Sequence, residues 1–405
     1  MTGMNRLITT IRPYAWGSLT AIPDLLGTEP TGEPQAELWM GAHPGAPSRI
    51  DRGNGPEPLD VVIAADPAGE LGESSVKRFG PTLPFLLKVL AAGAPLSVQV
   101  HPDLAQAKAG FADEEARGIP LDAPERNYKD ANHKPEMIVA LSEFDGLCGF
   151  RDPAQAAELI EALGVDTLTP YVDILRAHPE DRALREVLAA VLGAEPHAIA
   201  ATVHAATEAA RRLSADPTTP FASDYAAYAK AAHSFPGDRG IIAAMLLNHV
   251  RLQPGEALYL GAGVPHAYLD GLGVEIMANS DNVLRCGLTP KHIDVPELLR
   301  IVRFEAGDPG VLRPEAGPDG EELYAAPIDE FRLSRYSLAP GSDPSVLEAG
   351  TPQILLCTSG IAHLETIGAG NGTLTLGPGE SAYVPATERT SITGNGTVFR
   401  ATVTA

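Results

Sequence analysis

Apolar and polar side chains alternate in the segment Leu96-Ser97-Val98-Gln99-Val100-His101-Pro102-Asp103. Successive side chains of a β-strand point to opposite faces, so the three polar residues share one face and the three apolar residues share the other. Burying a polar row costs free energy unless it meets water, a ligand or a metal ion. The pattern therefore predicts a strand that packs through one face and carries chemistry on the other.

Short apolar runs separated by glycine and proline continue this pattern through the first 150 residues. Such runs are typical of β-strands. We also expect a short helix near residues 59–65 and a partly helical excursion over 103–132. The expected strands cover residues 6–11, 36–40, 83–90, 96–100 and 137–141.

From about residue 152 the apolar side chains are spaced three and four apart in alanine-rich sequence, which indicates helices. Proline directly after Asp152 and Glu195 suits the first turn of a helix. The helices should form a separate layer inserted into the β structure. We expect about five of them, over residues 154–163, 180–192, 196–213, 223–232 and 238–250.

Strand patterns return after Val250, and two segments there resemble each other at a constant offset of 124 residues. Residues 252–261 read LQPGEALYLG and residues 376–385 read LGPGESAYVP. Pro-Gly is a common turn signal, so coincidence is one explanation. The other is a duplicated antiparallel β unit, which favours jelly rolls. At this offset His266 corresponds to Thr390, so we expect only the first copy to carry a site.

Charge and composition exclude several classes of function. The net charge is -22, whereas nucleic-acid and anionic membrane surfaces call for clustered Lys and Arg. Cys148, Cys286 and Cys357 are widely separated, which indicates reduced thiols. The N-terminus shows no signal-peptide core, and the longest apolar runs, such as 240–247, are too short to span a bilayer. We therefore expect a soluble cytoplasmic protein that binds neither nucleic acid nor membrane.

Side chains able to carry chemistry gather in four segments. Gln99 and His101 form the first, NHKPEM with Glu136 the second, and GAGVPHAY with His266 the third. The fourth is the polar run GVEIMANSDNVLRCGLTPK over 273–291. Each segment alone fits an ordinary loop or a hydrogen-bonded surface pair. Together they supply two imidazoles, one carboxylate and one neutral oxygen donor, a set that suits a divalent metal ion.

These motifs resemble those of type I mannose-6-phosphate isomerases. The resemblance rests on LSVQVHPD, NHKPEM, GVPHAY and EIMANSDNVLRCGLTPK, together with YAWGS and ELWMGAHP, and spans residues 14–291. It implies a mainly β fold of tandem cupin-type antiparallel jelly rolls with an α-helical insertion. We expect the catalytic cupin domain over 1–151 and 251–325, the helical domain over 152–250, and a C-terminal cupin-like domain without metal ligands over 326–405.

The resemblance also implies a reaction and a metal. Members of this family interconvert mannose 6-phosphate and fructose 6-phosphate through an enediolate, with one Zn²⁺ per chain. Such a zinc site has a net charge of about +1, which attracts an anionic sugar and polarises a hydroxyl or carbonyl. The family's zinc ligands carry over onto Gln99, His101, Glu136 and His266.

Aldose to ketose conversion removes a proton beside a carbonyl, returns it one carbon away and stabilises the enediolate between the two steps. We assign Arg285, which is always charged, to the negative charge of the enediolate. We assign the proton transfers to Asp281 and Lys134, with Glu275 as an orienting group or alternative base. His133 is a further catalytic candidate, because it lies in a motif of the same kind.

The substrate phosphate needs cations and hydrogen-bond donors, and we expect Ser97, Lys88 and Lys291 to supply them. Lys88 equally fits a strand lysine whose charged end reaches solvent. A sugar phosphate is the partner that we expect, and we expect a monomer, with a weak homodimer as the alternative. Two other functions fit the same ligands: a cupin oxygenase that uses iron or manganese, and a cupin that binds sugar phosphates without catalysis.

Overall fold

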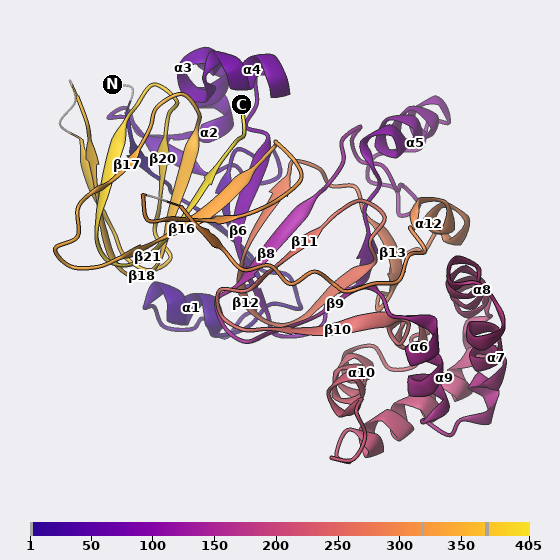
Figure 1. Ribbon diagram of the computed structural model, residues 1–405. Coiled ribbons are helices and arrows are strands. Elements are labelled where there is room, and N and C mark those ends of the chain that lie inside the picture. The colour runs from indigo at the N-terminus through magenta and orange to yellow at the C-terminus, as the bar shows by residue number, and fades with distance from the viewer. Residues whose placement is uncertain (1–2, 318, 369–371) are drawn as a thin grey trace.

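The computed structural model describes residues 3–317, 319–368 and 372–405. Two antiparallel sheets and a layer of helices make up the fold, which confirms the predicted combination of β structure and helical insertion. In Figure 1 the sheet of the C-terminal residues lies at one end, the sheet that contains β7 lies in the middle and most helices lie at the other end.

The first sheet contains ten strands, and the predicted polar strand is one of them. They are β2 (Thr10–Arg12), β3 (Glu37–Gly41), β6 (Phe85–Ala92), β7 (Val98–Val100), β8 (Glu136–Ala140), β9 (Phe144–Phe150), β10 (Leu247–Leu252), β11 (Ala257–Leu260), β12 (His266–Ala278) and β13 (Leu284–Gly287). The path runs β10-β9-β12-β6-β3-β2; β12 also pairs with β7 and β8, which pair in turn with β13 and β11. The long strand β12 therefore pairs with four strands of this sheet: β6, β7, β8 and β9.

The second sheet contains nine strands and is packed against the first. They are β1 (Asn5–Arg6), β14 (Glu315–Ala316), β15 (Glu321–Tyr324), β16 (Arg332–Leu338), β17 (Ser345–Leu347), β18 (Gln353–Thr366), β19 (Thr373–Leu376), β20 (Ser381–Val384) and β21 (Thr390–Thr402). One apolar core joins the two sheets, for example through Phe85 and Val274 of the first and Tyr324 and Phe399 of the second. A small hairpin, β4 (Arg49–Asp51) with β5 (Pro56–Pro58), completes the β structure.

The helical layer confirms four of the five predicted helices. It consists of α6 (Pro153–Glu161), α7 (Thr169–Ala177), α8 (Glu180–Gly193), α9 (Pro196–Leu213), α10 (Ala222–Ser234) and α11 (Gly240–Ala244). The helix expected over 238–250 is wrong beyond Ala244, because residues 247–252 form β10 and pair with β9, which satisfies their backbone hydrogen bonds across the sheet. Helix α7 was not expected.

Other helices lie outside this layer: α1 (Ala21–Leu26), α2 (Leu59–Ala65), α3 (Pro67–Leu71), α4 (Glu73–Phe79), α5 (Leu104–Ala116) and α12 (Val295–Ile301). Helices α2 and α5 confirm the short helix and the helical excursion that the sequence predicts. Among the described residues no single helix has the length and hydropathy to cross a membrane. Helices α8 and α9 have that length and hydropathy only when taken together, and the pair is bent by 114°.

The internal repeat corresponds to a repeated β unit. Strands β20 and β21 begin and end 124 residues after β11 and β12. The turns before them also match: Gly255 and Gly379 have φ values of 91° and 79°, and the Glu256 and Glu380 carboxylates each accept the backbone N–H three residues earlier. Glycine suits both turns because other residues rarely adopt positive φ. The repeat in the sequence is therefore also a repeat in the backbone.

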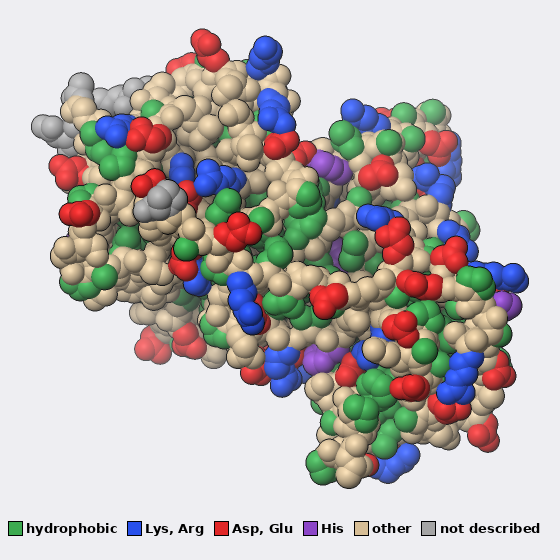
Figure 2. Space-filling view, in the orientation of Figure 1, with side chains coloured by type: hydrophobic (Ala, Val, Ile, Leu, Met, Phe, Trp, Pro, Cys, Tyr) green, Lys and Arg blue, Asp and Glu red, His purple; other side chains and the backbone are tan. Residues whose placement is uncertain are grey.

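The surface and the thiols agree with the composition. On the face that Figure 2 shows, acidic and basic side chains are interspersed across the surface and not gathered in one patch. The three cysteines are free and buried. Their distance from solvent fits thiols that pack in the core.

Candidate active site

Strand β7 holds the centre of the site, as the opening alternation predicted. Val98 and Val100 are fully buried in the core on one face. On the sheet, Gln99 lies directly opposite His266 of β12 on one side and Arg285 of β13 on the other. A strand of three residues thus brings together side chains that are up to 186 positions apart in the sequence.

Two imidazoles and one carboxylate converge beside β7. The Nε2 atoms of His101 and His266 lie 3.4 and 3.3 Å from the same oxygen, Oε2 of Glu136. The Nδ1 atoms lie 2.8 Å from the Asn282 carbonyl and 2.9 Å from the Val264 carbonyl. A carbonyl only accepts, so each Nδ1 carries a hydrogen, and in the neutral form of such a ring the lone pair is on Nε2, the atom that faces the carboxylate.

This arrangement fits a metal ion. Two lone pairs and an anionic oxygen repel one another unless a cation lies between them, and the buried Nε2 of His101 has no hydrogen-bond partner among the described residues. Burial lowers the pKa of His101 to about 4, so this ring is neutral and able to ligate at pH 7. Gln99 donates its amide N–H to Ser97 Oγ at 3.3 Å, which leaves its carbonyl oxygen for another partner. The chemistry of these donors suits a divalent cation.

Glycine keeps the two histidines together. The turn before β12 passes so close to α12 and the residues after it that a Cβ on Gly263 would lie 2.5 Å from Arg303 Cγ and 3.0 Å from the Ile301 carbonyl oxygen. The N–H of Gly263 donates to the backbone carbonyl of His101 at 2.9 Å. The glycine-rich turn that the sequence singled out therefore anchors one ligand strand to the other.

A second charged cluster lies across three neighbouring strands. Lys88 of β6 is the register partner of Trp39 on β3 and of Glu275 on β12. Its Nζ lies 3.2 Å from Glu275 Oε2 and 3.5 Å from Glu37 Oε1. The hydroxyl of Tyr268 donates to the other Glu275 oxygen at 2.9 Å. Lys88 is therefore held between carboxylates and does not reach solvent as a surface lysine would.

Burial sets the protonation behaviour of this cluster. It raises the pKa of Glu275, and the neighbouring carboxylates add to the rise while Lys88 opposes it. Burial alone would lower the pKa of Lys88, but Glu37 and Glu275 raise it overall, so the ammonium stays charged. The pKa of Glu136 is well below its usual range despite burial, because Lys134 and His101 are close. A carboxylate with a raised pKa beside protonated amines can exchange protons with a ligand.

A cavity of about 280 Å³ connects both clusters. Arg285 and Lys291 lie close enough for their charges to interact, and Arg285, followed by burial, lowers the pKa of Lys291. Two cations that face one cavity favour an anion there. Nine of the twelve residues predicted for the site line this cavity: Lys88, Ser97, Gln99, Lys134, Glu136, His266, Glu275, Arg285 and Lys291. A tenth, His101, belongs to the His-Glu-His group.

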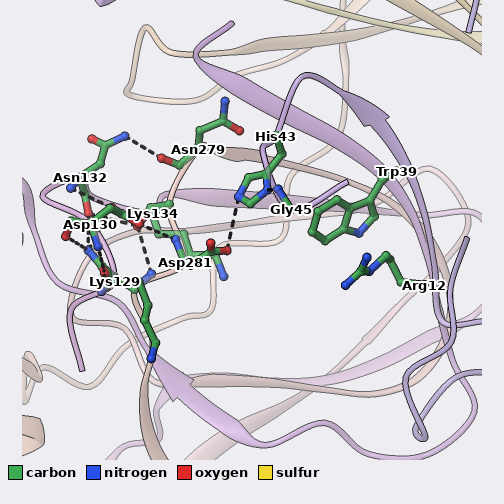
Figure 3. Close-up of polar contacts among 12 residues, drawn as sticks. Arg12, Trp39, His43, Gly45, Lys129, Asp130, Asn132, Lys134, Asn279 and Asp281 are labelled. Atoms are coloured by element: carbon green, nitrogen blue, oxygen red, sulfur yellow. Dashed lines mark hydrogen bonds and ion pairs between the residues drawn. The ribbon is translucent and has the colours of Figure 1, made fainter. Parts of the chain in front are cut away.

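The remaining two predicted residues do not line the cavity. Asp281 is paired with His43, whose Nε2 lies 3.4 Å from Asp281 Oδ1, and its side chain is 58% exposed (Figure 3). The hydrogen bond from His43 lowers the pKa of Asp281 and keeps it ionised. His133 contacts the carboxylate of Glu330 through Nε2, and Glu330 follows β15 in the C-terminal part of the chain. Neither side chain therefore lines the cavity, although Lys134 and Lys88 are close enough to lower the pKa of Asp281 further.

Polar contacts between two loops hold the ligand segments in place. Figure 3 shows Asp130 and Asn132 facing the loop that contains Asn279 and Asp281. Asp130 accepts the N–H of Asp281 at 2.8 Å, and Asn132 donates to the Asn279 carbonyl at 3.0 Å. The Asn282 side chain receives the N–H of Lys129 at 2.7 Å. This network fixes the loop that leads to Arg285 against the loop that leads to Glu136.

Several residues of the site lie in motifs that the sequence highlighted without receiving a role. Tyr268 follows His266 by two positions, so the alternation of a strand already placed both on one face. Glu37 and Trp39 share a strand face in the same way. The last two, Tyr14 and Trp16 of the YAWGS motif, line the cavity with their rings stacked 5.8 Å apart.

The chain is similar to known isomerases over nearly its whole length. Residues 4–153 match the model of the phosphomannose isomerase type I catalytic domain. The mannose-6-phosphate isomerase of Escherichia coli (strain K12) is 40% identical over 403 residues, which are 98% of this chain and 99% of that protein. A crystal structure of mannose 6-phosphate isomerase from Salmonella typhimurium, bound to substrate and zinc, has 37% identity and a TM-score of 0.88, covering 99% of this chain and all of that one.

In addition to this similarity, the chain has a site in which two histidines and a glutamate from separate segments converge beside a cavity lined by cations. The match also includes the sheets that position those residues, since the superposition covers both of them. The chain therefore belongs to the mannose-6-phosphate isomerase family, type I, a family of enzymes.

Proposed function

We propose that this protein interconverts mannose 6-phosphate and fructose 6-phosphate as a zinc-dependent aldose-ketose isomerase that uses an enediolate intermediate. The observation that carries the proposal is the convergence of the Nε2 atoms of two imidazoles, His101 and His266, on the Glu136 carboxylate, beside a cavity lined by Arg285 and Lys291. The relatives' names and the zinc in the related crystal structure support this substrate and this metal.

Gln99, His101, Glu136 and His266 would hold the zinc ion. When bound, the ion polarises a hydroxyl or carbonyl oxygen of the sugar and lowers the free energy of negative charge on it. Without the ion, the described side chains around the cavity include three carboxylates (Glu37, Glu136, Glu275) and four cations (Lys88, Lys134, Arg285, Lys291). The cavity therefore attracts an anionic sugar although the whole chain carries a net charge of -22.

Glu275 is the group that we assign to the proton beside the carbonyl. It lines the cavity, and burial raises its pKa toward the range in which a carboxylate both takes and returns a proton. Asp281, the other candidate from the sequence, is half exposed and paired with His43. Lys134, whose Nζ lies 3.3 Å from Glu136 Oε1, and Lys88 serve as protonated donors to the sugar oxygens.

Arg285 and Lys291 bind the negative charges of the substrate. Arg285 lies between the metal ligand Gln99 and Lys291, so it is in reach of charge that develops on the reacting oxygens. Lys291 and Ser97 complete the phosphate end of the cavity. In this assignment the strand β7 sets the axis along which the sugar lies.

We also propose that both sheets belong to tandem cupin-type jelly rolls, with the catalytic domain over 1–151 and 251–325, the helical domain over 152–250 and the C-terminal domain over 326–405. The repeat of β11 and β12 as β20 and β21 supports the duplication. The antiparallel pairing of both sheets is of the kind that jelly rolls use.

A coupled assay tests the proposed reaction. Mannose 6-phosphate is supplied to the purified protein, fructose 6-phosphate formation is recorded, and metals are counted by elemental analysis. We expect turnover, about one zinc per chain, and loss of turnover after chelation that added zinc restores. Bound iron or manganese with oxygen consumption and no isomerisation would identify an oxygenase. Tight binding of fructose 6-phosphate without turnover would identify a binding protein.

A further inference from the structure

The segment between Arg285 and Lys291, the two cationic residues that line the cavity, has an unusual backbone. Leu288 has a φ of 53°, and it is the only residue other than glycine with positive φ in the part of the chain that the structure describes. Its side chain is fully buried, and the preceding residue, Gly287, has a φ of 149°. A residue with a Cβ is strained in the left-handed region and stays there only where its surroundings hold it. Arg285 and Lys291, which line the cavity, lie on either side of this strained pair.

The start of α11 in the helical layer holds the segment. Asp238 accepts the N–H of Gly240 with Oδ1 at 2.7 Å and the N–H of Thr289 with Oδ2 at 3.0 Å. A Cβ on Gly240 would lie 2.4 Å from the Leu288 nitrogen and 2.6 Å from the Gly287 Cα. The two backbones are therefore in direct contact, and only glycine at 240 leaves room for it.

The contact extends to the cation that follows. The backbone N–H of Lys291 donates to Thr289 Oγ1 at 3.1 Å, so the hydrogen bonds run from Asp238 through Thr289 to Lys291. Among the described residues, no side-chain carboxylate bonds to Arg285 or Lys291, although the two cations are close enough to repel each other. The position of Lys291 beside Arg285 is thus imposed by the backbone that carries it.

We propose that Asp238 and Gly240 are positioning residues for binding the anionic end of the substrate: they hold Gly287-Leu288-Thr289 in the strained conformation that keeps Lys291 beside Arg285 at the cavity. The inference rests on the proposed function for the identity of that anion, a sugar phosphate. It gives the helical layer a part in substrate affinity, because Asp238 and Gly240 lie where α11 begins.

Two variants and a matched control test the proposal. Gly240→Ala pushes the segment away, and Asp238→Asn leaves one acceptor oxygen where two N–H groups need one each. Gly193→Ala, at the end of α8, is the control because its new Cβ meets nothing within 4 Å. For each protein we would measure kcat and KM for mannose 6-phosphate, the affinity for inorganic phosphate by calorimetric titration, zinc content and thermal unfolding.

If the two residues position the phosphate site, Gly240→Ala and Asp238→Asn should each raise KM and weaken phosphate binding by about tenfold. The value of kcat should stay within about twofold, because the lost binding is common to the ground state and the transition state. Asp238→Ala, which removes both acceptors, should exceed Asp238→Asn in both effects. Zinc content should stay unchanged, and Gly193→Ala should behave as the unmodified protein.

Unchanged KM and phosphate affinity in folded Gly240→Ala and Asp238→Asn would overturn the proposal. So would a loss of kcat alone or a loss of zinc, since either places the effect at the metal and not at the anion. If Gly240→Ala does not fold, Asp238→Asn decides. A protein that fails to isomerise mannose 6-phosphate, yet loses phosphate affinity in these variants, would refute the proposed function and leave the positioning role standing.

Discussion

The two copies of the repeated β unit share a backbone and differ in what their strands carry. In the first copy, β12 presents His266, Tyr268 and Glu275 to the site. At the offset of 124 residues, β21 carries Thr390, Ile392 and Phe399. Ile392 and Phe399 are at most 1% exposed and belong to apolar cores.

Strands and turns of the same geometry are therefore not enough to form a site. In the second copy, apolar side chains at these positions need no polar partners, because burial alone stabilises them. The polar row of the first copy needs ion pairs, a cavity and a metal ion to offset its desolvation. One scaffold thus supports both outcomes, and the side chains at equivalent positions decide which occurs.

The largest expected effect is at the first pair of equivalent positions, His266 in β12 and Thr390 in β21. His266→Ala removes one imidazole from the metal site, and we expect zinc to fall from about one per chain to nearly none, with activity lost. Thr390→Ala, its counterpart in β21, should keep both zinc and activity. Elemental analysis of the two purified proteins makes the comparison, and full zinc retention by His266→Ala would remove His266 from the ligand set.

The next effect tests which carboxylate moves the proton. The counterpart of Glu275 in the second copy is Phe399. Glu275→Gln keeps the shape of the glutamate side chain but cannot accept the proton. We therefore expect kcat to fall by about 100-fold or more, with zinc retained. Asp281→Asn should lower kcat much less, since Asp281 does not line the cavity. Steady-state kinetics of both variants decide. The reverse order of effects would return the role to Asp281.

A smaller effect concerns Tyr268, whose counterpart Ile392 has no hydroxyl. Tyr268 donates to the ionised form of Glu275, so Tyr268→Phe should raise the Glu275 pKa further. A base acts only when deprotonated, and activity falls as pH drops through its pKa. The acid limb of kcat/KM against pH should therefore move upward by about one pH unit. Tyr259→Phe, on β11, is the control, and an unmoved limb in Tyr268→Phe would argue against Glu275 as the base.

The smallest effect concerns the matching turns of the two copies. Gly255→Ala and Gly379→Ala each place a Cβ in the left-handed region, which costs about 1–2 kcal/mol of unfolding free energy. The Cβ at 379 would also lie 2.4 Å from Leu26 Cδ2, whereas the Cβ at 255 would meet only the movable end of Arg335, so Gly379→Ala should lose more stability. Urea denaturation measures that cost, and kcat should not change in either variant. Equal losses of stability in the two variants would show that Leu26 moves away from the new Cβ without cost.

Strand alternation and motif content predicted much of the site. The polar face of β7 and the repeat follow from local pattern, because a strand repeats every two residues whatever surrounds it. The ligand set came from the motifs and from the family that they resemble. The expected helix over 238–250 was wrong in its second half because pairing with β9 outweighed local helix preference. Proton-transfer roles could not be decided either, since Asp281 and Glu275 lie in one motif and only their burial separates them.

The sequence was enough to predict the side chains of the metal site, a strand with one polar and one apolar face, and a second copy of the β unit without the histidine. Tertiary structure alone decided that Lys88 lies between Glu37 and Glu275, that His133 turns to Glu330, and that Asp238 and Gly240 hold the strained segment at Leu288. The reason is physical. Side-chain period and turn chemistry are local, whereas register, burial and the contact of one backbone with another depend on packing between segments far apart in the chain.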